Sequence, residues 1–362
     1  MKILVYPKDT NNPYQKLLYS DISKTNTVTY FSFPTQSKIG GLLLFFPKII
    51  WMRLQGYTLF HIHWLYELGF IFKNPVLVFL SQLFFFVYSL TFITVLKLLG
   101  FKIVWTVHNV STHEKQTLND SFVSKYLAFC SNALIVHSKD TIAQLRTLGI
   151  NHQNVSVIPH GNYIGYYENT VSKHNAQKKL GIAENTFTYL YFGQIRGYKG
   201  VDTLLDTFEK VHKENPGTQL IIAGQCNEAS LKEKIETFQK NYPKSLYFYS
   251  KYIRDSEIQN YFKAADCVVI PFKRSTTSGS VLLALTFSKP IVYPDIGNMK
   301  EFPEDIGFRY EANNFKSFET ALKKAFNEKN KLNSYEKNAF EFTKQFNWDG
   351  IQKKTLDLYR SL

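Results

Sequence analysis

Two cations stand between glycines in the stretch FGQIRGYKGVDTLLDTF at residues 192–208. An apolar, strand-like run ends just before Gly193, and a helix-like pattern begins near Gly200. Arg196 offers a planar fork of donors and Lys199 a point charge, a pair that suits a diphosphate. A solvated basic loop would have the same composition, but the flanking glycines and the position after a strand favour an anion site. We therefore predict that Arg196 and Lys199 bind a diphosphate.

A second part of the same anion site is expected in STTSGSVLLAL at residues 275–285, which follows the strand-like run CVVIPF. A turn of small hydroxyl residues that leads into a helix leaves backbone N–H groups free, and the helix dipole points at that turn. A helix that is only well capped would show the same pattern, but the neighbouring diphosphate loop favours an anion. The residues expected to supply N–H groups and hydroxyls are Thr277, Ser278, Gly279, which allows close approach, and Ser280.

Histidine and glutamate side chains in the first half of the chain are candidates for proton transfer. A general base beside an acceptor hydroxyl is most naturally a His or a Glu. His108 stands at a strand–loop junction, and His113 and Glu114 follow it in the loop. We take His108 and Glu114 as the candidate bases, with Glu67 behind them. A polar residue that only stabilises its loop is the alternative for each.

Other histidines are expected in the core or against substrate rather than on a metal. His61 and His63 share one face of a strand by their spacing of two, but no third ligand is evident nearby. The three cysteines are far apart and show no metal-ligand spacing, so we expect free thiols in a reducing compartment and no metal. His160 and Gly161 end the last strand-like run of the first half and are expected, like His63, to line a cleft.

The elements that must position these residues alternate between strand and helix. Apolar strand-like runs and helix-like segments follow one another twice along the chain, a pattern that predicts an α/β fold of two doubly wound, Rossmann-like domains. The strands are expected at 2–6, 59–64, 102–109, 133–138 and 155–160, and then at 188–193, 219–224, 246–250, 267–272 and 290–294. We expect a first domain at 1–165 plus 347–362, a linker with a short helix at 166–185, and a second domain at 186–346.

Composition and charge limit the class of protein. Hydrophobic residues make up 44% and charged residues 20% of the 362 residues, which excludes wholesale disorder. The formal net charge of +14 supports an anionic partner such as nucleic acid, phospholipid or a phosphorylated substrate. The basic residues are scattered and the aromatic runs are not interleaved with them, so no nucleic acid is expected. The start of the chain lacks the long apolar core of a signal peptide.

Two apolar segments raise the question of a membrane. Residues 76–96 carry no charge over a length that could cross a bilayer. Crossing would put the strands expected at 59–64 and 102–109 on opposite sides, so we favour a helix with one face on the sheet and the other in the membrane interface. The segment 42–55 mixes aromatic residues with Lys48 and Arg53, as interfacial helices do. A purely soluble, buried helix is the alternative.

The diphosphate loop resembles that of the family 4, or group 1, glycosyltransferases of the GT-B fold. Further segments that resemble this family are FHIHWLYE, IVWTVHNVSTHE, VIPHGNYIGYY, AADCVVIPF and TSGSVLLALTFSKPIVYP. The resemblance covers nearly the whole chain and is greatest to the bacterial exopolysaccharide (xanthan-type) β-mannosyltransferases, whose first loop resembles NNPYQKLLY with Asn12, Pro13 and Tyr14. It implies that Arg196 and Lys199 hold a nucleotide-sugar diphosphate in place of a metal. It also implies nucleoside contacts around Tyr252 and Ile253, His108 facing the donor sugar, and a final helix that crosses back to the first domain.

The sequence departs from the retaining members of this family at two glutamates. Their expected positions fall on Ser275 and Leu283, so ribose recognition must differ and retention is in doubt. The xanthan-type enzymes also have a Ser-Gly turn here and invert. We therefore favour inversion by direct displacement, in which a base deprotonates the acceptor hydroxyl.

The sequence thus predicts a metal-independent hexosyltransferase with no cofactor, which uses a GDP-sugar in preference to a UDP-sugar and favours mannose. The expected acceptor is a lipid-linked saccharide in exopolysaccharide or surface-glycan synthesis. The expected location is cytoplasmic, peripheral on the inner face of the cell membrane through 42–55 and 76–99. Two alternatives stay open: an inactive basic module that binds membrane or nucleic acid, and another nucleotide-sugar enzyme such as an epimerase.

Overall fold

The computed structural model describes residues 1–10, 12–32, 38–65, 74–110, 115–274 and 279–362, with the side chains of 38–40 and 42–43 left out. The chain forms two units, the first from Met1–Gly161 with Trp348–Leu362 and the second from Asn162–Asn347. Each unit holds one parallel sheet of six strands. The α/β architecture of two doubly wound sheets, predicted from the sequence, is confirmed.

The first sheet has the strand order β2-β1-β3-β4-β5-β6, and all its pairs are parallel. Its strands are β1 (Lys2–Tyr6), β2 (Thr27–Tyr30), β3 (Leu59–Ile62), β4 (Lys102–Val107), β5 (Ala133–Val136) and β6 (Val155–Val157). The helices of this unit are α1 (Tyr14–Tyr19), α2 (Ile22–Thr25), α3 (Lys38–Leu54), α4 (Pro75–Leu98), α5 (Asp120–Cys130), α6 (Lys139–Thr147) and α14 (Trp348–Arg360).

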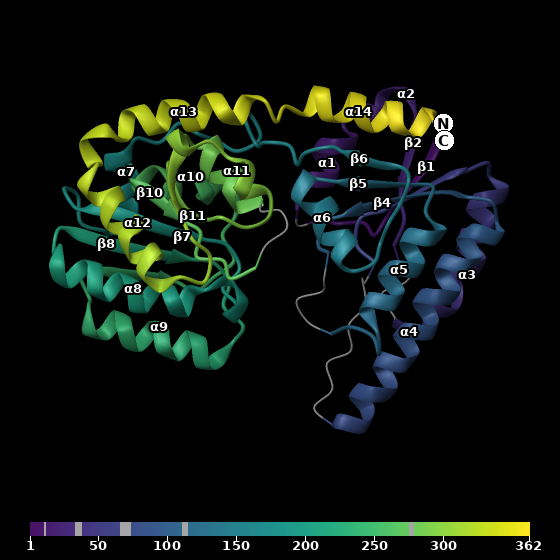
Figure 1. Cartoon of the computed structure of the whole chain (residues 1–362), viewed down its shortest axis with the longest axis horizontal. Coiled ribbons are helices and arrows are strands. Elements are labelled where there is room, and N and C mark those ends of the chain that lie inside the picture. The colour runs from purple at the N-terminus through teal and green to yellow at the C-terminus, as the bar shows by residue number, and fades with distance from the viewer. Residues whose placement is uncertain (11, 33–37, 66–73, 111–114, 275–278) are drawn as a thin grey trace. The chain divides into compact units, whose positions relative to one another are not determined.

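Alternation along the strands divides the core of the first unit into two layers. Successive strand side chains point to opposite faces, so Leu4 of β1 joins one hydrophobic cluster and Val5 joins the other. The cluster around Leu4 is covered by α3, α4 and α5, and the cluster around Val5 by α1 and α14 (Figure 1). The last helix of the chain therefore completes the core of the first unit.

The second sheet has the order β12-β11-β10-β7-β8-β9, again with parallel pairs. Its strands are β7 (Phe187–Phe192), β8 (Thr218–Ala223), β9 (Leu246–Tyr249), β10 (Cys267–Val269), β11 (Ile291–Pro294) and β12 (Gly307–Tyr310). Its helices are α7 (Lys173–Leu180), α8 (Val201–Glu214), α9 (Ala229–Asn241), α10 (Asp255–Ala264), α11 (Gly279–Thr286), α12 (Phe315–Asn327) and α13 (Leu332–Lys344). Residues 166–185, expected as a linker, lie in this unit, where α7 packs against α10.

Three elements were not foreseen from the sequence: β2, β12 and α13. The strand β2 is an edge strand with no fully buried residue, so it lacks the apolar run that marks a buried strand. The strand β12 begins at Gly307, where a Cβ would lie 2.1 Å from the carbonyl oxygen of Ile291. Glycine is thus needed for close pairing with β11, although in the sequence it reads as a turn residue.

Candidate functional site

The predicted diphosphate loop lies at the carboxyl end of β7, a central strand of the second sheet. Gly193 follows the strand with φ +136°, a short 3-10 turn covers Gly197–Lys199, and Gly200 with φ +72° begins α8. A Cβ on Gly200 would lie only 1.9 Å from the carbonyl oxygen of Pro271. This position therefore requires glycine both for its left-handed backbone and for its contact with the segment after β10.

The segment after β10 also contacts the loop at Tyr198 and Lys199. Lys199 Nζ lies 3.9 Å from the ring centroid of Phe272, and the backbone N–H of Lys273 donates to the carbonyl oxygen of Tyr198 at 3.3 Å. Burial, with a smaller contribution from the charge of Arg196, lowers the pKa of Lys199 to about 8. A cation that is partly desolvated beside a second cation gains strongly from an anionic ligand.

The first turn of α11 lies beside this loop. A Cβ on Gly193 would lie 3.3 Å from Ser280 Oγ, so the end of β7 and the start of α11 are in contact. Gly279 is the first residue of the helix. The structure thus brings Gly279 and Ser280 together with the diphosphate loop, as predicted, while Thr277 and Ser278 lie outside the described residues.

The residues expected around the nucleoside differ in exposure. Tyr252 is 61% exposed between β9 and α10, so its ring is available for stacking, whereas Ile253 is buried. Leu283, at the position of the second family glutamate, is buried in α11 and offers no polar atom for a ribose. A nucleoside role for Tyr252 and Ile253 remains a prediction.

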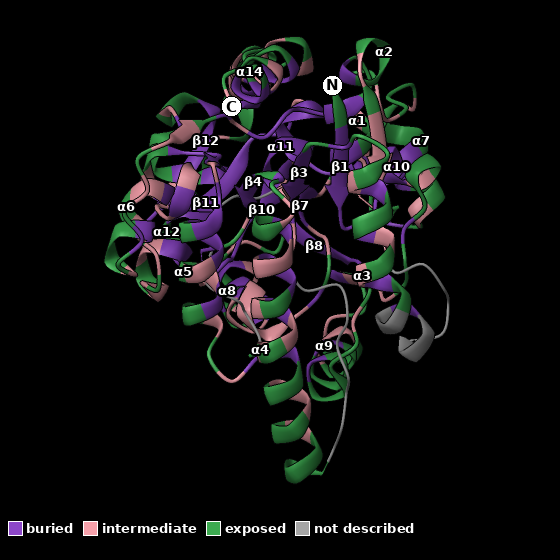
Figure 2. Cartoon of the chain, turned by 90° about the vertical axis from the view of Figure 1, so that its right-hand side faces the viewer, coloured by how far each residue is buried: buried purple, intermediate pink, exposed green. Residues whose placement is uncertain are grey.

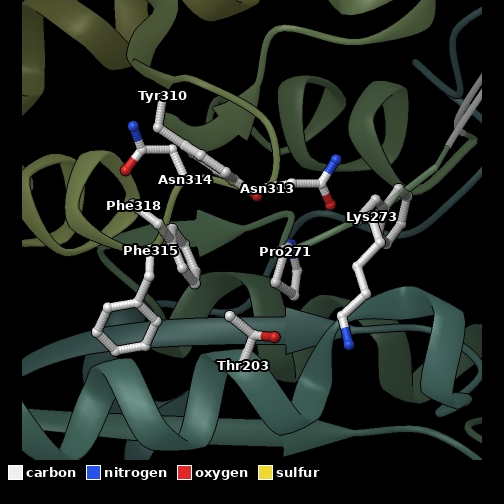
Figure 3. Close-up of a pocket in the computed structure, with 9 residues that line it drawn as sticks. Thr203, Pro271, Lys273, Tyr310, Asn313, Asn314, Phe315 and Phe318 are labelled. Carbon is white, nitrogen blue, oxygen red and sulfur yellow. The ribbon is translucent and has the colours of Figure 1, made fainter.

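A separate cavity of about 180 Å³ lies on another side of the same segment (Figure 3). It is lined by the first turn of α8, by Pro271–Lys273, and by Tyr310, Asn313 and the start of α12. Its lining includes neither Arg196 nor Lys199, and Lys273 forms an ion pair with Asp202 at 2.8 Å. This cavity is therefore distinct from the diphosphate loop, and Lys273 anchors the start of α8.

In the first unit, a row of histidines follows four adjacent strands. His63, His108, His137 and His160 follow β3, β4, β5 and β6, so the parallel strands bring them to one edge of the sheet. The ring of Tyr14, from α1, lies over this row, with ring centroids 4.8 to 5.8 Å from all four imidazoles. The structure therefore brings together three of the predicted residues, His63, His108 and His160, and adds His137.

The imidazoles are neutral because they are buried. Burial lowers the pKa of His61 and His160 to about 3 and that of His137 to about 4, and it lowers the pKa of His63 and His108 well below the usual range. The neighbouring histidines oppose protonation further. A neutral imidazole has one N–H donor and one acceptor nitrogen.

Because each neutral imidazole has one donor and one acceptor nitrogen, the direction of each hydrogen bond along the histidine row can be assigned. The carbonyl oxygen of Ile158 can only accept, so His137 Nδ1 donates to it at 2.8 Å. His137 Nε2 then accepts from His108 Nδ1 at 3.4 Å, and His108 Nε2 accepts from His63 Nδ1 at 3.3 Å. His63 Nε2 in turn accepts from the hydroxyl of Tyr19 at 2.9 Å. Each of the three imidazoles thus carries its proton on Nδ1.

The chain of hydrogen bonds continues to the last helix, α14. Because the Tyr19 hydroxyl donates to His63, it accepts from His61 Nδ1 at 2.6 Å, and His61 Nε2 accepts from the Thr106 hydroxyl at 2.7 Å. The hydroxyl of Tyr359, in α14, contacts both His61 Nδ1 and the Tyr19 hydroxyl. The chain of hydrogen bonds thus joins β3, β4 and β5 to α1 and α14 through side chains that are far apart in the sequence.

Both ring nitrogens of His108 are engaged, although its ring is partly exposed and stacks on Trp64 at 4.6 Å and 15°. To accept a proton from a substrate, its Nε2 would have to exchange the 3.3 Å bond from His63. The other candidates for proton transfer, Glu67, His113 and Glu114, lie outside the described residues. Across the residues that the structure describes, no group of three or more His, Cys, Asp or Glu side chains could hold a metal ion.

The loop of Asn12 and Pro13 is held close to the histidine row. Asn12 accepts from the Tyr14 backbone N–H at 3.0 Å, and its own N–H donates to Asp9 at 3.1 Å, so it fixes the start of α1. Gly161 follows the row, and a Cβ there would lie 2.3 Å from the ring of Trp348. His160 and Gly161 are thus packed in the first unit, and a role as cleft-lining residues remains a prediction.

Three residues of the network were missed from the sequence: Tyr19, His137 and Tyr359. A signal existed for His137, because the apolar runs FHIH, WTVH, LIVH and VIPH each end in histidine. No local signal existed for Tyr359, which is 298 residues from His61.

Comparison with known proteins bears on both units. Residues 172–342 match the family described as "Glycosyl transferases group 1". The chain is 25% identical over 231 residues to the GDP-mannose:glycolipid 4-beta-D-mannosyltransferase of Xanthomonas campestris, a match covering 63% of this chain and 60% of the relative. It is 24% identical over 240 residues to the UDP-Gal:alpha-D-GlcNAc-diphosphoundecaprenol alpha-1,3-galactosyltransferase of Escherichia coli, with the same coverage. The chain thus spans about 60% of the length of these curated relatives.

A solved structure matches over the full length of both chains. Anabaena HepE in complex with UDP and glucose has a TM-score of 0.79 and 15% sequence identity, with 100% of each chain covered. The fold is therefore that of the GT-B glycosyltransferases, and residues 172–342 are similar to the glycosyltransferase group 1 family. The resemblance inferred from the sequence is confirmed.

Proposed function

We propose that the chain is a hexosyltransferase that transfers a sugar from a nucleoside diphosphate sugar to a lipid-linked saccharide. The observation that carries the proposal is the contact between the loop of Arg196 and Lys199 and the first turn of α11, within the region similar to the group 1 family. Mannose and GDP are favoured because the Xanthomonas relative is named for GDP-mannose. The E. coli relative, named for UDP-Gal, makes a UDP-sugar the alternative donor.

In the proposed reaction the loop stabilises the leaving group. As the bond between the anomeric carbon and the diphosphate oxygen breaks, negative charge builds on the diphosphate. Arg196 and Lys199 would neutralise it, together with the N–H groups at the start of α11. A half-buried Lys199 is well suited to this role, since its charge is screened less than that of an exposed lysine.

We propose inversion by direct displacement. A base removes the proton of the acceptor hydroxyl, the oxygen attacks the anomeric carbon, and the nucleoside diphosphate leaves from the opposite side. Glu114 and His108 are the proposed bases, with Glu67 behind them. His108 is neutral and therefore able to accept a proton, but both of its ring nitrogens are engaged, which favours a glutamate as the base.

The proposed acceptor places the protein at a membrane surface. Exposed apolar side chains lie on both segments expected to contact lipid, among them Trp51 and Leu54 of α3 and Phe79 and Leu80 of α4. They support a peripheral location on the cytoplasmic face of the membrane, where a lipid-linked saccharide would be extended in exopolysaccharide or surface-glycan synthesis.

Calorimetric titration with GDP, UDP, ADP and dTDP tests the donor. We expect GDP to bind most tightly and Arg196→Ala with Lys199→Ala to weaken binding at least about hundredfold, because two charged contacts to the diphosphate are lost. The matched control, Lys213→Ala with Lys240→Ala, removes two exposed charges from α8 and α9 and should leave binding unchanged. Absence of binding by every nucleotide would refute the proposal.

The product decides among the remaining alternatives. With GDP-mannose and a lipid-linked saccharide, a β-linkage by NMR supports inversion, and an α-linkage overturns it. Release of an isomerised nucleotide sugar without transfer indicates an epimerase. Membrane binding that survives the loss of Arg196 and Lys199, with no sugar transferred by the unaltered protein, indicates an inactive binding module.

A further inference from the structure

The helix α4 has two different halves. Its buried residues, Phe85, Ser89, Phe92, Ile93 and Leu96, all lie from Phe85 onward, and Phe92, Ile93 and Leu96 pack in the core of the first unit. None of residues 75–84 is buried, and this end of the helix extends beyond the rest of its unit (Figure 2). Only 22% of the most apolar 18-residue window of the helix is buried. The first half of α4 is therefore an apolar surface without a protein partner among the described residues.

The exposed side chains of this half form one stripe. At 100° per residue they cover an arc of about 160°, opposite the arc of the buried residues. The stripe consists of Val76 (62% exposed), Leu77 (44%), Phe79 (54%), Leu80 (51%), Leu83 (39%), Phe84 (44%) and Val87 (53%). It is about 17 Å long at 1.5 Å per residue. A neighbouring exposed ring, Phe122 of α5, is joined to α4 through Phe86 at 5.8 Å.

The first-turn N–H groups and the Ser81 hydroxyl of this half have hydrogen-bond partners. Pro75 has no N–H, and the side chain of Asn74 accepts from the N–H groups of Val76 and Leu77 at 2.9 and 3.4 Å. The hydroxyl of Ser81 donates to the carbonyl oxygen of Val78 at 2.7 Å. The first-turn donors that a helix normally leaves to water are thus already paired, which suits an apolar solvent.

The charges fit a membrane with anionic headgroups. No charged residue occurs from Asn74 to Leu96. Residues 1–165 hold 14 Lys/Arg and 6 Asp/Glu, a formal charge of +8. An uncharged stripe on a basic part of the chain suits an acyl region that lies beneath anionic headgroups.

The strand pairing on either side of α4 opposes a crossing of the membrane. Among the described residues, α4 is the one helix long and apolar enough to cross a membrane by length and composition. However, β3 and β4, which precede and follow it, pair directly with each other, and its second half fills the core between α3 and α5. Crossing would break this sheet, so only the exposed stripe can enter lipid.

From these contacts we infer that the stripe Val76–Val87, with Phe122 beside it, is the surface by which this protein docks on an anionic lipid bilayer, in the plane of one leaflet. The buried face of α4 and the exposed Leu98 take no part. This inference deepens the membrane contact in the proposed function and rests on that part of it alone. Within the contact proposed through 42–55 and 76–99, it assigns a defined surface on α4.

Vesicle flotation of the full chain tests the inference, with no nucleotide sugar present. We expect binding to vesicles with phosphatidylglycerol, weaker binding to pure phosphatidylcholine, and a loss of at least about tenfold in Leu80→Gln with Phe84→Gln. Glutamine is a good helix former and both sites are exposed, so the fold should persist, as circular dichroism will check. The matched control is Leu98→Gln with Phe129→Gln, two more exposed residues (80% and 82%) outside the stripe, which should keep binding within about twofold.

Three outcomes would overturn the inference. The first is that the stripe variant binds vesicles like the unaltered protein. The second is that the control loses binding equally. The third is that the stripe variant changes only self-association in sedimentation, which would make a second copy the partner. Nucleotide binding in the second unit is measured separately, so its failure would refute the proposed donor without affecting this result.

Discussion

Lowering the pH from 7 to 5 should sharply destabilise the first unit, because its histidine network must stay neutral. Burial holds the pKa of His61 and His160 at about 3 and of His137 at about 4, and that of His63 well below its usual range. In the unfolded chain each titrates near about 6.5. The folded pKa values are therefore depressed, and between the two values the unfolded state binds more protons. Stability from these histidines is present above about pH 6.5 and is lost as the pH falls.

The size of the effect follows from the number of histidines. At pH 5, protonation stabilises the unfolded chain by RT ln(1 + 10^1.5), about 2 kcal/mol for each histidine, against about 0.2 kcal/mol at pH 7. These four histidines are 0 to 7% exposed in the folded unit, so protonation does not stabilise the folded state in compensation. The four together remove about 7 kcal/mol, which is comparable to the whole stability of a typical domain. The partly exposed His108 is left out of this sum.

Tryptophan fluorescence measures this unit selectively, because Trp51, Trp64, Trp105 and Trp348 all lie in it. Urea unfolding at pH 7, 6 and 5 should give a free energy of unfolding that falls by about 5 kcal/mol per pH unit near pH 5, equivalent to nearly four protons. In His137→Gln the slope should fall by about one proton. A free energy that changes by less than about 2 kcal/mol between pH 7 and 5 would refute the neutral network.

Other predictions concern the diphosphate loop and the last helix. Because the pKa of Lys199 is about 8, GDP binding should weaken about tenfold from pH 7 to pH 9. Lys199→Arg should remove this pH dependence. Calorimetry checks both, and an affinity of the unaltered protein that stays constant with pH contradicts the role of Lys199. Gly200→Ala should destabilise the second unit by about 2–4 kcal/mol, since its Cβ would meet Pro271 with φ at +72°, and urea unfolding followed by circular dichroism would show it. Tyr359→Phe removes a hydroxyl from His61 and should cost about 1–3 kcal/mol by tryptophan fluorescence; a change below about 0.5 kcal/mol would mean that the contact is unimportant.

The sequence predicted what depends on short-range pattern. Ten of the twelve described strands were predicted from apolar runs, and the diphosphate loop was predicted from two cations and three glycines within eight residues. The half-buried edge strand β2 lacks such a run, so it was not foreseen. The glycine that pairs β12 closely with β11 conceals that strand, because the same residue is typical of turns.

The histidine network depends instead on strand order and register. His63, His108 and His137 meet only because β3, β4 and β5 are neighbours, and Tyr359 joins them only because α14 returns to the first unit. Neither fact is encoded in a local period. For this reason His63 and His108 were predicted from the sequence as separate candidates, and the hydrogen bond between them was not foreseen.

The return of α14 has a consequence for the order of events during synthesis. Ile351, Leu358 and Tyr359 complete one core layer of the first unit, although the ribosome makes them after the whole second unit. The second unit, from Asn162 to Asn347, is continuous and can fold as it emerges. The first unit, although translated first, must wait with one layer of its core covered by α1 but not yet by α14. Nascent chains of this protein should therefore hold a folded second unit beside an unfinished first one, and the interval before α14 emerges is when chaperones are most needed.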